Sequence, residues 1–445
     1  MTRSSRYWRE VSGGCRAASV SLSSRATRAA TPSSSSLSIP VISGPFLVNP
    51  LVTLSADLNL ERNLSPLTTS CPDRNVHFAT GHFVPGRNRP EEGAAMRLPM
   101  PAEPLDIPAA WLGRDIQDQP EQWSYEFTER DVAELLAATE HITELGVDLT
   151  GINPRNFRLA GLGPTLKAAA LQLSQGLGVV LLRGLPIAEL PIDVVEKMYF
   201  GLSTHLGIPV AQNAKGDLLG NVRNEGASYG RTVRAYQSNV PLTYHNDSTD
   251  IVGLACVRPA KSGGLSRVIS AVTLHNTLMR EAPDALRTLY DEPSYFSWKG
   301  EEPPGQHPYY WARVFSYYQG QLTTCYSNRL ILETQKHYSD VPPMSDAHRA
   351  ALETVEEIAA RPEMCLDMDF KPGDIQFLHN FHVWHSRTGF EDYEDPALRR
   401  HLLRVWLAEY SPRQVSVAST NRTEQLAEHG RLPRRRVFDV PAFAE

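Results

Sequence analysis

The sequence predicts a mixed α+β, β-rich protein built on an antiparallel sandwich or jelly roll. Two observations carry this prediction. From Ile251 onward, short apolar runs alternate with turn signals rich in Gly, Pro and Asp, which is typical of many short strands. Before Ile251 the chain shows helical periodicity around one buried strand, so we expect an N-terminal helical flank.

Composition limits the classes of protein that the chain can represent. Its 445 residues are 41% hydrophobic, enough for one large β-rich domain with insertions or for two or three average domains. Lys and Arg number 44 against 50 Asp and Glu, for a net charge of -6, so no nucleic-acid partner is expected. No apolar run approaches the ~20 residues that cross a bilayer, which predicts a soluble protein without a membrane partner. The composition does not decide whether the protein forms a homo-oligomer.

The cysteines argue against a disulfide framework or a structural zinc site. They are odd in number and form no Cys-x-x-Cys pair. This usage favours a reducing compartment, and the cytoplasm is the expected location. The five are Cys15, Cys71, Cys256, Cys325 and Cys365.

The chain begins with a segment, residues 1–95, that we expect to be a disordered or low-complexity extension. It is rich in Arg and Ser, poor in acidic residues, and contains a serine run from Ser33 to Ser36. The same composition is that of a mitochondrial transit peptide, which gives the alternative location. The predicted domain spans residues 96–412, and residues 413–445 form a C-terminal tail.

The N-terminal flank is predicted as three helices and one strand. Thr128 caps a helix that ends near Gly146, and further helices run from Thr165 to Gln175 and from Pro191 to His205. Between the last two, the apolar run Gly178 to Gly184 is bounded by glycines and predicts a buried strand.

The remainder is predicted as strands with two helices, at Asp284 to Tyr290 and Asp346 to Ala360. One hairpin is expected about Gln319 and Gly320, and another hairpin-like unit about the turn Lys371 to Asp374. The predicted strands are Ile251 to Val257, Leu265 to Val272, Tyr309 to Tyr318, Gln321 to Tyr326, Met364 to Phe370, Ile375 to Leu378 and His401 to Tyr410.

A candidate metal site lies in the stretch Tyr244-His245-Asn246-Asp247. In an extended strand residues two apart point to one face, which would place His245 beside Asp247. His385 is the preferred third ligand. Two imidazoles and a carboxylate on one face of Fe(II) leave the opposite face open for a co-substrate and O2. A lone His-x-Asp pair is a weak signal in a chain with 14 histidines.

An ordered set of motifs strengthens this hypothesis. Together they resemble the TauD/TfdA family of Fe(II)- and 2-oxoglutarate-dependent dioxygenases, over roughly Glu129 to Tyr410. The motifs are Val180-Leu181-Leu182-Arg183-Gly184-Leu185-Pro186, His245-Asn246-Asp247, Gly263-Gly264, Gly373-Asp374-Ile375, His385-Ser386-Arg387 and Arg400-His401-Leu402-Leu403-Arg404.

The resemblance implies a double-stranded β-helix (jelly-roll, cupin-like) core with helical insertions and a mononuclear iron. It further implies oxidation of a small organic substrate with O2, coupled to conversion of 2-oxoglutarate into succinate and CO2. Two alternatives stay open: a catalytically inactive jelly-roll binding protein, and a metal-dependent cupin oxygenase that does not use 2-oxoglutarate. The type of oxidation is also open.

The far carboxylate of 2-oxoglutarate needs a fixed cation, and an arginine fork binds a carboxylate with two hydrogen bonds. Strand alternation puts Arg400 and Arg404 on one face of the last strand. By resemblance, Arg400 binds 2-oxoglutarate, Arg404 is a second arginine that reaches an acidic substrate, and Ser266 replaces a threonine hydroxyl for the same co-substrate. The loop between His385 and Arg400 is long and acidic, so Arg399 stays an alternative to Arg400 as the residue that binds 2-oxoglutarate.

Three residues are candidates for substrate contact: Asn239, Tyr244 and Arg404. Each has a plainer interpretation, because Asn239 could be a turn residue and Tyr244 could pack in the core. Arg404 could grip 2-oxoglutarate or pair with an acid of its own chain, such as Asp374 or Glu409. His379 and His382 are interpreted as core residues or as partners that fix the tautomer of a ligand imidazole.

Overall fold

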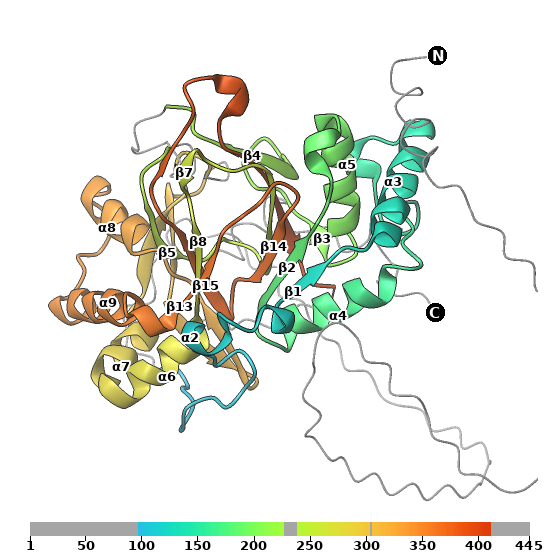
Figure 1. Cartoon of the computed structure of the whole chain (residues 1–445). Coiled ribbons are helices and arrows are strands. Elements are labelled where there is room, and N and C mark those ends of the chain that lie inside the picture. The colour runs from blue at the N-terminus through green and yellow to red at the C-terminus, as the bar shows by residue number, and fades with distance from the viewer. Residues whose placement is uncertain (1–96, 227–237, 303–304, 411–445) are drawn as a thin grey trace, which may run out of the picture. The chain divides into compact units, whose positions relative to one another are not determined.

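The computed structural model describes residues 97–226, 238–302 and 305–410, in which helices flank a sheet-rich centre (Figure 1). The mixed, β-rich class predicted from the sequence is confirmed. The predicted extension and tail, together with Cys15 and Cys71, lie outside the described residues. Within the described residues, no helix is long and apolar enough to span a membrane.

The larger sheet has seven strands, and all its pairs are antiparallel except the parallel pair β1 and β2. In spatial order its strands are β1 (Ser124–Glu126), β2 (Val179–Arg183), β14 (Ile375–His379), β6 (Ile251–Arg258), β17 (His401–Ala408) and β3 (Ile208–Pro209), with β4 (Leu219–Arg223) also paired to β17.

The smaller sheet is antiparallel and has four strands. Their order is β13 (Cys365–Met368), β8 (Ser266–Ser270), β15 (Val383–Arg387) and β5 (Leu242–His245). Three further strand pairs lie outside these sheets: β7 (Ser262–Gly263) with β16 (Phe390–Glu391), β9 (Ser294–Ser297) with β10 (Tyr309–Ala312), and β11 (Phe315–Tyr318) with β12 (Gln321–Thr324).

The two sheets pack face to face over a shared apolar core. Val252 and Leu402 of the larger sheet belong to one buried cluster with Val268 and Val383 of the smaller sheet. We call the side of the smaller sheet turned to this core its inner face. Two mainly antiparallel sheets over one core are the arrangement expected of a jelly roll.

A second apolar cluster covers the outer face of the smaller sheet. Ile269 and Trp384 of that sheet pack there against three helices, α6 (Ala271–Glu281), α7 (Pro283–Asp291) and α9 (Asp346–Ala359). Trp384 stacks on Tyr326 with ring centroids 4.2 Å apart. Because side chains alternate along a strand, residues next to Trp384 in β15 must point to the inner face.

The flanking helices follow the sequence prediction closely. α3 (Glu129–Glu144) begins at a capping box between Thr128 and Asp131, and α4 (Gly163–Ser174) and α5 (Ile192–Ser203) follow. α4 contacts β2 and α5 contacts β17, so these helices cover the larger sheet. The short helix α2 (Gly113–Ile116) lies against β13.

Two predicted elements are wrong in extent. The strand expected to end at Val272 ends at Ser270, whose hydroxyl accepts a hydrogen bond from Thr273 N at 2.9 Å and so starts helix α6. The strand expected from Tyr309 to Tyr318 breaks at residues 313–314 into β10 and β11, although the hairpin about Gln319 and Gly320 is confirmed. Sequence analysis also missed α6 and α8 (Asn328–His337).

The hairpin expected about Lys371 to Asp374 is wrong. β13 pairs with β8 in the smaller sheet, whereas β14 pairs with β2 and β6 in the larger one. The turn therefore carries the chain from one sheet to the other. Gly373 has φ +91° there, and an added Cβ would lie 2.0 Å from Leu185 O. Only glycine fits so close to another backbone.

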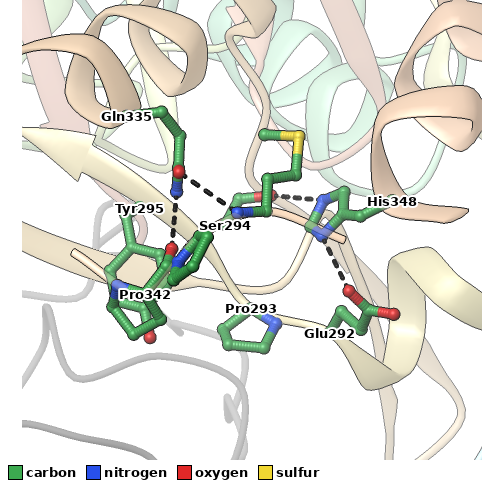
Figure 2. A pocket seen from close by; sticks show the side chains of 9 residues that line it. Glu292, Pro293, Ser294, Tyr295, Gln335, Pro342 and His348 are labelled. Carbon is green, nitrogen blue, oxygen red and sulfur yellow. Dashed lines mark hydrogen bonds and ion pairs between the residues drawn. The ribbon is translucent and has the colours of Figure 1, made fainter. Parts of the chain in front are cut away.

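A pocket of about 90 Å³ lies outside the two sheets, beside the start of α9 (Figure 2). In it His348 Nε2 lies 3.0 Å from Ser294 Oγ, and His348 Nδ1 lies 3.5 Å from Glu292 Oε2. Ser294 is only 1% exposed, so this chain of groups is not an accessible nucleophile. Ser345 caps α9 and donates to the same glutamate at 2.7 Å, so the network anchors the helix.

His275 gives the fold a dependence on pH. It is fully buried with Nε2 3.0 Å from Tyr290 Oη, and burial lowers its pKa to about 4. The unfolded chain, with a histidine pKa near 6.5, therefore binds the proton more tightly. Stability is complete above about pH 6.5 and is lost as pH falls toward about 4.

We expect His275→Gln to reduce this acid sensitivity. Between about pH 7.5 and about pH 5 the wild type should lose about 2 kcal/mol more unfolding free energy than the variant. Urea unfolding at both pH values measures the difference. Equal losses in the two proteins would show that His275 takes up its proton as easily in the fold as in the unfolded chain.

Candidate active site

The site forms where two strands of the smaller sheet meet. His245 ends β5 and His385 lies in β15, and the two are direct partners across the antiparallel pair. Their rings lie 4.4 Å apart between centroids. A nitrogen of each imidazole and a carboxylate oxygen of Asp247 all lie within 4.8 Å of one another. The three predicted ligands are therefore brought together.

Asp247 reaches the site by a route that differs from the one predicted. β5 ends at His245, so Asp247 lies beyond the strand and strand alternation does not place it. Its position comes from the amides of Asn380, which is buried, and Asn246, which is half-buried. Asn380 Oδ1 accepts from Asp247 N at 3.0 Å, and Asn380 Nδ2 donates to Thr249 O at 2.9 Å. Asn246 Nδ2 donates to Asn380 O at 3.0 Å, which ties the turn to the end of β14.

The Asp247 carboxylate is held in its charged form. Burial alone would raise its pKa, but Arg404 and the two histidines, together with a hydrogen bond from Trp406 Nε1 to Oδ2 at 3.0 Å, lower it to about 2. The side chain is 12% exposed. An ionised carboxylate at neutral pH is the form that binds a metal.

His385 is held neutral. Burial, aided by the neighbouring His245, lowers its pKa to about 3. Its buried Nδ1 has no hydrogen-bond partner among the described residues. His245 Nδ1 instead lies 2.9 Å from the Thr243 carbonyl, which fixes that ring's tautomer and leaves Nε2 free to bind a metal.

Two neighbouring arginines differ sharply in environment. Arg399 is exposed, and its guanidinium donates to the carbonyls of Tyr393 and Glu394 at 3.2 Å. Arg400 is 5% exposed, and burial lowers its pKa to about 10. Its guanidinium carbon lies 5.1 Å from the centre of the Phe390 ring.

Ser266 and Arg404 both lie in the space between the sheets. Ser266 Oγ lies 3.3 Å from Gln376 Oε1 of the larger sheet. Arg404 lies between Leu402 and Trp406, which belong to the shared core, and donates from Nε to Gln212 Oε1 at 2.7 Å. Its Nη1 is 3.7 Å from Asp247 Oδ2, so it faces the candidate metal site.

The acids suggested as partners for Arg404 contact other residues of the fold. Asp374 pairs with Arg183 at 2.7 Å, and Glu409 lies 3.3 Å from His379. The rings of His379 and His382 are tilted by 30° to each other, with centroids 4.3 Å apart.

The other two substrate candidates differ in environment. Asn239 is exposed. Tyr244 packs on the outer-face cluster of the smaller sheet, and its hydroxyl interacts with Cys365 and Ser386. Successive residues of β5 point to opposite faces, so Tyr244 points away from His245.

Arg387 ends the motif His385-Ser386-Arg387, from which no role could be predicted for it. It is 6% exposed, and burial, aided by the nearby Arg400, lowers its pKa to about 9. The sequence predicted no strand here, but β15 spans Val383–Arg387, and two residues after His385 Arg387 must share the face of that ligand.

Two imidazoles and one carboxylate that converge in this way are the donor set of a class of protein, the mononuclear non-haem iron oxygenases. Residues 141–406 match the model of the taurine catabolism dioxygenase TauD, TfdA family. The chain belongs to this family. It is a 2-oxoglutarate-dependent non-haem iron dioxygenase, an oxidoreductase that uses Fe(II), 2-oxoglutarate and O2.

Individual relatives agree with the family. The FR-33289 synthase of Streptomyces rubellomurinus is 35% identical over 327 residues, covering 72% of this chain and 95% of that protein. The taurine hydroxylase-like protein SAT17 of Stachybotrys chartarum is 28% identical over 312 residues, covering 68% and 79%. A crystal structure of asparagine oxygenase with Fe(II), 3-hydroxyasparagine and succinate has a similar fold, with a TM-score of 0.51 at 16% identity, covering 65% of this chain and 94% of that one.

Asn380→Ala tests the buried amide that holds Asp247. The change leaves Asp247 N and Thr249 O without their partners, so we expect unfolding free energy to fall by about 2–4 kcal/mol. Urea unfolding of the metal-free protein measures it. The control is Asn239→Ala, an exposed position where the change should stay within about 0.5 kcal/mol. If Asn380→Ala also changes the unfolding free energy by no more than about 0.5 kcal/mol, the Asn380 contacts contribute no net stability.

Proposed function

We propose that the chain oxidises a small organic molecule at a single Fe(II) held by His245, Asp247 and His385 on a double-stranded β-helix core. The oxidation is coupled to conversion of 2-oxoglutarate into succinate and CO2. The observation that carries this proposal is the convergence of the three ligand atoms within 4.8 Å from a strand, its partner strand and a turn.

The donor set fits Fe(II). Two neutral imidazole nitrogens and a carboxylate oxygen are the donors of a facial triad. Their total charge of −1 only partly offsets the 2+ charge of Fe(II), so the bound metal still attracts an anionic 2-oxo acid. Bound there, Fe(II) would supply the activation of O2 that couples substrate oxidation to loss of CO2. The low pKa values of Asp247 and His385 keep both side chains in their ligating forms at neutral pH.

The residues around the ligands fix their orientation. Trp406 Nε1 binds Oδ2 of Asp247, which limits rotation of the carboxylate, and the Thr243 carbonyl orients the His245 ring. Next to His385, the inner face carries apolar side chains such as Val268 and Val383. Both side chains are fully buried, so this part of the face is apolar.

Arg400 is the proposed anchor for the far carboxylate of 2-oxoglutarate, with the Ser266 hydroxyl as a second contact. Burial supports Arg400 over Arg399, because a cation removed from water binds a carboxylate far more strongly than an exposed one. Gly264 lies beside it with φ +76°, and an added Cβ there would be 3.4 Å from Arg400 Nε.

Arg404 bears on the class of substrate. The sequence leaves open whether its charge binds an acidic substrate or pairs within the chain, and Gln212 and Asp247 lie beside its guanidinium. A paired cation needs no anionic substrate. We therefore propose a small-molecule substrate whose recognition does not depend on Arg404.

Two alternative functions make different predictions for the same site. An inactive binding protein would hold iron without turnover, and a cupin oxygenase without a 2-oxo acid would leave the buried Arg400 with no role. A complete donor set together with a buried arginine fork favours the 2-oxoglutarate enzyme.

The direct test is succinate release from 2-oxoglutarate in the presence of Fe(II), with acidic and neutral candidate substrates run side by side. His245→Ala, Asp247→Ala and His385→Ala should each abolish turnover and weaken metal binding while the fold persists. Normal turnover in His385→Ala would contradict the triad. Stimulation by acidic compounds alone, lost in Arg404→Leu, would restore the acidic-substrate hypothesis.

Arg400→Gln should raise the KM for 2-oxoglutarate without altering metal affinity. Loss of one partner of a desolvated charge pair costs about 2–5 kcal/mol, so we expect an increase of at least about thirtyfold. Arg399→Gln is the matched control, one residue away and exposed. A larger effect of Arg399→Gln would transfer the anchor to that residue.

A further inference from the structure

Arg387 shares the inner face of β15 with His385. Val383 belongs to the core between the sheets, and side chains alternate along β15, so Val383, His385 and Arg387 point the same way. The cross-strand partner of Arg387 in β8 is Ser266. Arg387 therefore lies beside the serine proposed to contact 2-oxoglutarate.

The Arg387 guanidinium uses only part of its bonding capacity. Nη2 donates to the carbonyls of Ser238 and Val240. Nε and Nη1 are buried and have no hydrogen-bond partner among the described residues. Buried N–H groups of a charged side chain are costly to leave unpaired, so these atoms are suited to an acceptor that arrives from outside the chain.

The local charges leave an excess of one positive charge. Arg387 and Arg400 both lie over the ring of Phe390, with guanidinium carbons 4.6 Å and 5.1 Å from its centre. Asp392 is the acid that acts on both cations. One Asp392 oxygen accepts from Arg400 N at 2.8 Å, and the other has no partner among the described residues. Two cations and one carboxylate match a single additional carboxylate.

We propose that Arg387 is a second cation for the distal carboxylate of the 2-oxo diacid, acting together with Arg400. This inference rests on the proposed function. The spacing supports it, because two residues along a strand span about 7 Å, which is comparable with the reach of a five-carbon diacid bound to a metal at His385.

A purely structural role would also use Arg387, because its Nη2 holds the backbone at Ser238 and Val240 just before β5. The two roles differ in their dependence on ligand charge. A residue that only holds backbone would affect all 2-oxo acids and the metal alike. A residue that binds the distal carboxylate would affect only ligands that carry one.

The test measures binding to the full chain loaded with Mn(II) by calorimetry, without turnover. The ligands are 2-oxoglutarate and 2-oxopentanoate, which has a methyl group in place of the distal carboxylate. Arg387→Gln should weaken 2-oxoglutarate binding roughly ten- to a hundredfold, the effect of losing charged hydrogen bonds. Binding of 2-oxopentanoate and Mn(II) should not change.

Two further variants make the result decisive. Arg387→Lys keeps the charge and should retain most of the affinity for 2-oxoglutarate, whereas the exposed Arg399→Gln should match the wild type. Unchanged 2-oxoglutarate binding in Arg387→Gln overturns the inference, as does equal weakening of both 2-oxo acids or of Mn(II). Failure of the wild type to bind 2-oxoglutarate would instead overturn the proposed function.

Discussion

The register between β5 and β15 is the constraint on which the site depends. His245 and His385 face each other across this pair, and a slip of one residue would turn one imidazole to the opposite face. Burial fixes the register from both sides, because Val383 packs in the core between the sheets and Trp384 in the cluster under the helices. The apolar cores thus determine where two of the three candidate ligands point.

The same geometry brings charged groups into an apolar space, where their interactions are strong. Asp247 is ionised because Arg404 and Trp406 offset the cost of burying it. Arg387, further along the inner face, and Arg400, just before β17, share one carboxylate among the described residues, that of Asp392. At one end of the space, the ionised Asp247 and the two imidazoles can therefore bind a cation. At the other end, two arginines and one carboxylate leave an excess of positive charge.

The features that could be predicted from the sequence are those set by short local patterns. The cap at Thr128, the strand before Gly184 and the ligand motif could all be predicted, because each depends on a few consecutive residues. Nonlocal features could not. Ala271 and Val272 are apolar and resemble the end of a strand, although the Ser270 cap makes them the start of a helix. The sequence of the turn at Gly373 does not indicate that the strands before and after it belong to different sheets. The role of Asn380 depends on a contact with a turn 133 residues away.

The two proposed carboxylate cations are held in different ways, and this difference has a consequence. Arg387 lies on the same strand as His385, so its distance from the metal ligand is set by the rigid pleat of β15. Arg400 enters from the loop that precedes β17 and is tied through its backbone to Asp392. On the proposed function, Arg387 would fix the length of co-substrate that fits, whereas the acidic loop would adjust how firmly Arg400 closes on it.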